Sequence, residues 1–173
     1  MPVDPLKQQL YQLAHRLRSH DIPLIVGGGY GLLLKAKYIR ELGERTRVDQ
    51  LPIARSTGDV DLFLTASVII DANSTDAIRS ALDDLGYLPV PGAEYYQFYR
   101  DVEFGGTIRK TKFDFLSAPI SGPDQALVKM DKRRIRPRKG TGLHAHTTPE
   151  AATIESNLQR VVIDGEEEDV AVF

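Results

Sequence analysis

The stretch Arg55-Ser56-Thr57-Gly58-Asp59-Val60-Asp61-Leu62-Phe63-Leu64 places two carboxylates, one residue apart, at the start of an apolar run. Side chains alternate between the two faces of a strand, so we expect Asp59 and Asp61 to share one face. Two ionised carboxylates in close proximity repel each other unless a cation lies between them. Magnesium suits this position because it is a hard ion that prefers oxygen ligands. The alternative interpretation is a solvated turn that leads into a half-exposed strand.

A glycine cluster precedes this stretch. The short apolar run Leu24-Ile25-Val26 predicts a buried strand, Gly27-Gly28-Gly29 follows it, and residues 32–39 have a helical pattern. A glycine turn between a strand and a helix N-terminus presents backbone N–H groups and the positive end of the helix dipole to a phosphate. Leu32 breaks the dinucleotide-binding fingerprint, and the Gly-Lys-Ser/Thr of a Walker A loop is absent. The glycines therefore predict either a short phosphate-binding turn or simply a tight turn.

A third carboxylate lies further along the chain, in a strand predicted over residues 108–116. Asp114 is flanked there by Phe113 and Phe115. A charged residue in an apolar strand is disfavoured unless it is paired or binds a metal. Lys110 and Lys112 have the same strand parity as Asp114, which favours the alternative of a solvated sheet face.

These three features resemble the nucleotidyltransferase fold of the DNA polymerase beta superfamily. The family pattern is an apolar strand ending in glycines, then Asp-x-Asp, then a later strand aspartate; here these are Val26-Gly27-Gly28-Gly29, Asp59-Val60-Asp61 and Phe113-Asp114-Phe115. The sub-pattern of Arg55, Thr57, Asp59 and Asp61 is similar to the nucleotidyltransferase toxins of abortive-infection (AbiEii-type) toxin–antitoxin systems. The resemblance covers roughly residues 20 to 120. The chain departs from the family in its third glycine, its longer gap before Asp-x-Asp and its lack of the usual helical C-terminal region.

The resemblance implies an α/β (α+β) nucleotidyltransferase fold, with a mixed sheet flanked by helices. It also implies metal-dependent transfer of a nucleoside monophosphate from an NTP to an acceptor hydroxyl. The expected catalytic residues are Asp59, Asp61 and Asp114, which are also the expected ligands of Mg²⁺ or Mn²⁺. The residues expected to bind the NTP phosphates are Gly27, Gly28, Gly29, Arg55 and Thr57.

A basic segment over residues 129–139 bears on the acceptor. Its positive residues are Lys129, Lys132, Arg133, Arg134, Arg136, Arg138 and Lys139. Such a run binds phosphate backbones without sequence preference, although a solvated loop or a contact for an acidic partner would have the same composition. Together with the resemblance, it predicts an RNA acceptor such as the tRNA 3′ end, and a toxin with a cognate antitoxin. The alternatives are a non-catalytic nucleotidyltransferase-like binding module and an enzyme that modifies a small molecule such as an aminoglycoside.

The composition of the chain limits the number of domains and the classes of partner and site that it can have. The 173 residues predict one domain, and a net charge of −2 argues against polyanion binding by the chain as a whole. The absence of cysteine excludes disulfides and thiolate metal sites and is compatible with a cytoplasmic location. No apolar run reaches membrane-spanning length, so no membrane partner is expected. The strand-like C-terminus suggests an edge strand or a longer parent protein.

The remaining pattern predicts several elements that the structure can test. Asp4-Pro5 predicts a helix start, and Ser74-Thr75-Asp76 predicts the N-cap of a helix that ends at Gly86. The aromatic residues between 95 and 104 predict strands interrupted at Arg100-Asp101. Residues 150–158 are expected to be helical.

Overall fold

The computed structural model describes residues 4–43, 58–139, 142–156, 158–162 and 169–172. Arg55 and Thr57, which were predicted to contact NTP phosphates, lie outside these ranges. The helical elements are α1 (Pro5–Leu17), η1 (Arg18–His20), α2 (Gly28–Leu42), α3 (Ala66–Ile70), α4 (Ala72–Asp84), η2 (Gly122–Leu127) and η3 (Pro149–Ser156), where η marks a 3₁₀ segment. The strands are β1 (Ile25–Gly27), β2 (Asp59–Leu64), β3 (Leu88–Pro89), β4 (Gln97–Phe104), β5 (Thr107–Ser117), β6 (Val128–Asp131), β7 (Arg134–Pro137), β8 (Ala145–Thr147), β9 (Gln159–Val162) and β10 (Asp169–Val172).

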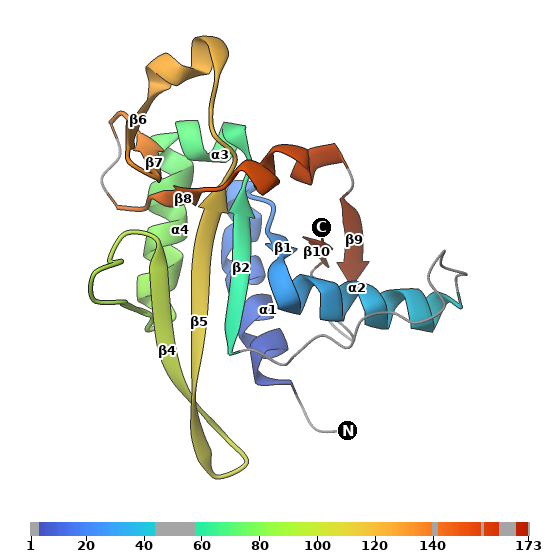
Figure 1. Cartoon of the computed structure of the whole chain (residues 1–173). Coiled ribbons are helices and arrows are strands. Elements are labelled where there is room, and N and C mark those ends of the chain that lie inside the picture. The colour runs from blue at the N-terminus through green and yellow to red at the C-terminus, as the bar shows by residue number, and fades with distance from the viewer. Residues whose placement is uncertain (1–3, 44–57, 140–141, 157, 163–168, 173) are drawn as a thin grey trace.

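In the described residues the strands form one curled, mixed sheet. Its main order is β6-β7-β8-β5-β2-β1-β10-β9, and β4 pairs with β5 outside this path. β2 runs parallel to β5 and antiparallel to β1, so the two strands with predicted aspartates lie side by side next to the strand that ends in glycine (Figure 1). The predicted α+β architecture, a mixed sheet flanked by helices, is confirmed at this level.

The main core lies on one face of the central strands. α1 and α4 cover this face and lie behind β2 and β5 in Figure 1. Val60, Leu62 and Leu64 of β2 and Phe113 and Phe115 of β5 are buried there. This alternation confirms that the apolar residues of β2 face away from its aspartates.

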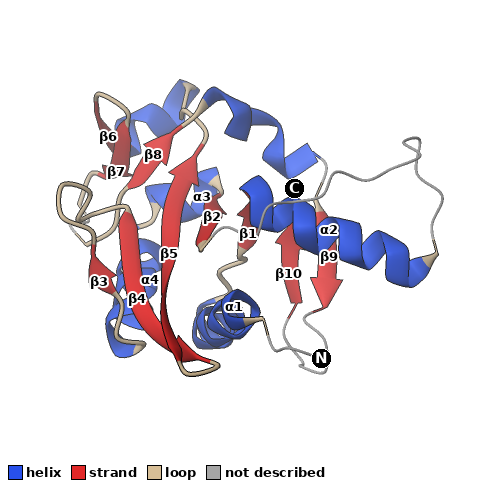
Figure 2. Cartoon of the chain, turned by 60° about the horizontal axis from the view of Figure 1, so that its bottom comes forward, coloured by secondary structure: helices blue, strands red, loops and turns tan. Residues whose placement is uncertain are grey.

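A smaller apolar cluster covers part of the opposite face. Phe63 packs there with Ile25 of β1 and with Ala151 and Ile154 of η3. At the far end of the sheet, α2 lies over β9 and β10 in both views (Figures 1 and 2). No helix in the described ranges is both long and apolar enough to cross a membrane.

Two helix starts follow from side-chain capping. Asp4 caps α1 as predicted, because its carboxylate accepts a hydrogen bond from the Leu6 amide. The predicted cap of α4 at residues 74–76 is wrong: Asp71 accepts from the Asn73 and Ser74 amides, and the helix begins at Ala72. The short helix α3, which ends at Ile70 directly before Asp71, was not predicted.

Two other expectations need correction. β4 runs without a break through Arg100-Asp101, because eight consecutive residues pair with β5. β10 is not an edge strand, since it lies between β1 and β9. The helix expected over residues 150–158 is present as the 3₁₀ segment η3, which ends at Ser156.

Candidate functional site

The strand register brings the predicted catalytic elements to one level of the sheet. Gly27 pairs with Asp61 across β1 and β2, and Asp61 pairs with Asp114 across β2 and β5. Paired residues on neighbouring strands direct their side chains to the same face. Asp59, which pairs with Lys112, shares that face because it is two residues from Asp61. Residues from two distant stretches of the sequence therefore form one carboxylate cluster, which comprises Asp59, Asp61 and Asp114.

The glycines fit closely against this cluster. Gly27 ends β1, and Gly28 begins α2 with a left-handed φ of 61°. A Cβ atom at Gly28 would collide with the Oδ2 atom of Asp61, and one at Gly27 would collide with the Phe63 ring. Gly29 lies in the first turn of α2 and is exposed. The glycine stretch is thus a strand-to-helix junction in which a glycine at position 28 allows the helix N-terminus to approach a carboxylate.

A lysine bridges two of the three carboxylates. Lys112 Nζ lies 3.3 Å from Asp59 Oδ2 and 3.4 Å from Asp114 Oδ2. The other oxygen of Asp114, Oδ1, is buried and accepts no hydrogen bond within the described part of the chain. A buried carboxylate oxygen without a donor is energetically costly, so this oxygen is suited to accept a hydrogen bond or to bind a cation.

The cluster disfavours its own ionisation. Burial raises the pKa of Asp61, nearby Asp59 raises it further, and Lys112 acts in the opposite direction. Burial likewise raises the pKa of Asp114 and outweighs its ion pair with Lys112. Burial lowers the pKa of Lys112, but Asp114 and Asp59 together raise it above its ordinary value. Lys112 therefore offsets only part of the repulsion and burial that oppose ionisation of Asp61 and Asp114.

The donor set suits a hard divalent cation. The three side chains offer carboxylate oxygens on adjacent strands, and one of these oxygens lacks a donor. Over the described ranges, however, no group of three or more acidic or histidine side chains is arranged to bind a metal ion. The Lys112 ammonium lies 3.3 Å from Asp59 and 3.4 Å from Asp114, so a cation held by these two carboxylates would have to displace it. The metal ligands remain a prediction.

Lys112 is a site residue whose role sequence reasoning missed. Its parity with Asp114 was visible, but the lysine was interpreted as a sign of a solvated face. The parallel register pairs it directly with Asp59, which only the arrangement of β2 beside β5 reveals. Gln97 of β4 pairs with Asp114 from the other side and was not predicted either.

The basic segment lies on the same sheet face as the carboxylates. It forms a hairpin of β6 and β7, in which Lys129 pairs with Arg136. Arg134 pairs with His146 of β8, and His146 pairs with Leu116 of β5, which has the same parity as Asp114. The positive side chains of β7 and the carboxylates of β2 and β5 thus face the same way across four neighbouring strands.

Comparisons with protein-family models, curated proteins and solved structures found no match for this chain. The functional argument therefore depends on the geometry of its own residues.

Proposed function

We propose that this protein is a metal-dependent nucleotidyltransferase that moves a nucleoside monophosphate from an NTP to an acceptor hydroxyl. The observation that carries the proposal is the convergence of Gly27-Gly28, Asp61 and Asp114 at one level of three adjacent strands. Two further observations add to it: the left-handed Gly28 brings the N-terminus of α2 against Asp61, and Asp114 Oδ1 has no hydrogen-bond partner in the described residues. The fold proposed with this activity is the nucleotidyltransferase fold of the DNA polymerase beta superfamily.

Each residue has a role that its position supports. Asp59 and Asp61 would hold both divalent ions, and Asp114 would hold the ion nearest the attacking oxygen. When bound, the ions would neutralise charge on the triphosphate and on the attacking oxygen. Asp114 would also accept the proton of the attacking hydroxyl. The amides at the start of α2 would contact the NTP phosphates, since they are directed out of the helix N-terminus.

The position of the basic hairpin supports an RNA acceptor. A nucleic-acid strand lying along β6 and β7 would reach β2 and β5 without leaving this face of the sheet. Seven positive side chains between residues 129 and 139 would attract its phosphates. Such an acceptor fits the toxin function that the sequence pattern predicts, with an antitoxin as the further partner.

Lys112 supports a second candidate function. A lysine that bridges Asp59 and Asp114 supplies the positive charge that a metal ion would otherwise provide. In that case the protein is a non-catalytic member of the fold, which binds a nucleotide or RNA through the same surface.

The two candidates are separated by a transfer assay with each α-³²P-labelled NTP, Mg²⁺ and total RNA. A nucleotidyltransferase is expected to label RNA with at least one NTP, to lose this activity in EDTA and to lose it in the Asp61→Asn variant. The matched control is Asp101→Asn, an exposed aspartate on β4, which should leave the labelling unchanged. Binding of RNA or NTP without any labelling would instead support the non-catalytic candidate.

A further inference from the structure

A groove beside the basic hairpin is separate from the carboxylate cluster. It has a volume of about 630 Å³ and is lined by residues of β6 and β7, Tyr95 and His144. Its positive side chains are Lys129, Arg134, Arg136 and Arg138. Asp131 also lines the groove and accepts a 2.8 Å hydrogen bond from Arg134 Nη2. A guanidinium carries five N–H donors, so this bond leaves Arg134 able to contact a ligand.

An aromatic pair forms one wall of the groove. The rings of Tyr95 and His144 stack with centroids 4.4 Å apart and an interplanar angle of 12°. His144 is only 9% exposed, and its Nδ1 atom has no hydrogen-bond partner within the described ranges. Tyr95 is 43% exposed, so its ring is accessible to a ligand in the groove. Burial, together with Arg136 and Arg134, lowers the pKa of His144 to about 4.

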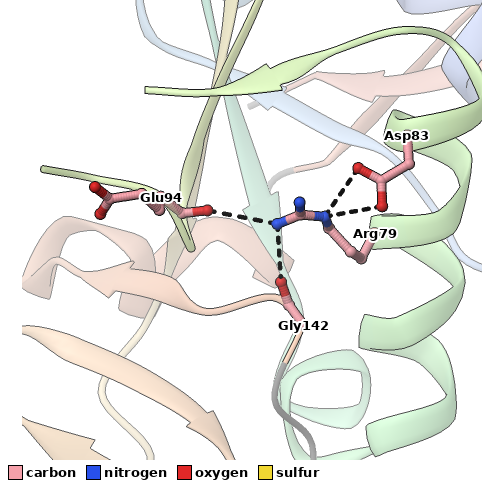
Figure 3. Close-up of polar contacts among 4 residues, drawn as sticks. All are labelled: Arg79, Asp83, Glu94 and Gly142. Carbon is pink, nitrogen blue, oxygen red and sulfur yellow. Dashed lines mark hydrogen bonds and ion pairs between the residues drawn. The ribbon is translucent and has the colours of Figure 1, made fainter. Parts of the chain in front are cut away.

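Arg79 hydrogen-bonds to the backbone on both sides of this aromatic pair. Arg79 of α4 donates to the carbonyl oxygens of Glu94 and Gly142, each at 3.5 Å, and is itself fixed by Asp83 (Figure 3). Glu94 directly precedes Tyr95, and the His144 amide donates to the Tyr95 carbonyl at 2.8 Å. The stacked rings are therefore positioned before any ligand arrives, which lowers the entropic cost of binding.

We propose that this groove binds a nucleotide, with the phosphate among Lys129, Arg134, Arg136 and Arg138 and the base against Tyr95. Charge alone selects a phosphate, since four cations line the groove against one carboxylate. The exposed tyrosine ring selects a flat aromatic group joined to that phosphate. The site does not depend on transfer at the carboxylate cluster and holds for a non-catalytic protein as well.

The ligand has two sources with the same chemistry, a free nucleotide or a nucleotide within an RNA strand. NMR titration of the histidine side-chain signals separates them. In EDTA, which prevents metal-dependent binding at the carboxylates, AMP is expected to shift His144 and to raise its pKa, because an anion beside Arg134 and Arg136 favours the imidazolium. Adenosine and inorganic phosphate should each bind at least tenfold more weakly than AMP.

Charge-matched variants test the location of the site. Lys129→Gln with Arg134→Gln removes two positive charges from the groove and should weaken AMP binding at least tenfold. Lys132→Gln with Arg133→Gln removes two from the hairpin turn, outside the groove lining, and should change it less than twofold. Tyr95→Leu should reduce AMP affinity to that of phosphate, whereas Tyr95→Phe should preserve it.

A trinucleotide identifies the source. Binding more than tenfold tighter than AMP would show that the groove holds a nucleotide within a strand, and equal binding would show that it holds a free nucleotide. Either result supports the site. Equal affinity for AMP and inorganic phosphate, no shift of His144, or equal weakening by the two double variants would overturn the proposal.

Discussion

Asp61 lies where the two halves of the candidate site meet. Its carboxylate lies against Gly28 on one side and is paired in register with Asp114 on the other. Burial and the charge of Asp59 both raise the pKa of Asp61, so the ionised form of this carboxyl is less favourable in the folded chain than in the unfolded chain. A charge kept against these forces is typical of a residue selected for binding or catalysis rather than for stability.

Replacement of Asp61 by Asn is expected to stabilise the metal-free protein at pH 7. A raised pKa means that the folded state binds the proton more tightly than the unfolded state, so stability falls as pH rises from the unfolded pKa through the folded one. Asn does not titrate and avoids this loss. We expect a higher Tm for the variant than for the parent, measured by calorimetry in EDTA.

The pH dependence is the control for this interpretation. Well below the unfolded pKa of about 3.9 the parent carboxyl is protonated in both states, so the Tm difference between Asp61→Asn and the parent should shrink toward zero there. A variant that is less stable than the parent at pH 7 would show that the Asp61 charge contributes to the fold.

Gly28 and Gly43 provide a matched pair at the two ends of α2. Both have left-handed backbones, with φ of 61° and 65°, but only at Gly28 would a Cβ atom meet the Asp61 carboxylate. Gly43→Ala should cost about 1–2 kcal/mol from backbone strain alone. Gly28→Ala should cost ~2 kcal/mol more, because the added methyl must displace the carboxylate or the helix start.

Chemical denaturation of both variants measures this difference. The extra cost at Gly28 should largely disappear when Gly28→Ala is combined with Asp61→Ala, because the carboxylate is then absent. Equal costs at the two glycines would mean that the junction tolerates a side chain and that Gly28 has no special relation to Asp61.

At the scale of elements, α4 depends on a cap that precedes it. Asp71 accepts from the Asn73 and Ser74 amides and from the Ser74 hydroxyl, and the Ser74 bonds lower its pKa. Asp71→Ala should therefore destabilise the protein by about 1 kcal/mol in urea unfolding. Asp76→Ala, inside the helix, should change the stability by less than about 0.5 kcal/mol. A larger loss of stability in Asp76→Ala than in Asp71→Ala would show that the N-cap lies at residues 74–76 instead.

The sequence correctly predicted elements that are determined by residues close together in the chain. Asp4-Pro5 gave the start of α1, and the alternation of Val60, Leu62 and Leu64 gave the buried face of β2. A break was predicted at Arg100-Asp101 because both residues are polar. The prediction was wrong because pairing with β5 continues through both residues. The cap of α4 was misplaced because three adjacent polar residues satisfy the N-cap pattern as well as Asp71 does.

At the scale of the whole molecule, the candidate site depends on register between strands that are far apart in the sequence. The order of the motifs predicted that Asp59, Asp61 and Asp114 would be associated, and the parallel pairing of β2 with β5 places them on one face. Lys112 between the carboxylates could not be predicted, because its contact with Asp59 depends on that register. The same applies to the shared face of the basic hairpin and the carboxylates, which follows from pairings through β8.

In the proposed function, the carboxylate cluster binds a divalent ion together with an NTP once Lys112 moves aside. Calorimetric titration of Mn²⁺ in the presence of a non-hydrolysable NTP analogue tests it without reference to the acceptor. The parent should bind Mn²⁺, Asp61→Asn should bind it at least tenfold more weakly, and Asp101→Asn should match the parent. Lys112→Met should bind Mn²⁺ more tightly than the parent when no nucleotide is present, because no ammonium then competes for Asp59 and Asp114. Equal Mn²⁺ affinity in the parent, Asp61→Asn and Lys112→Met would contradict the claim.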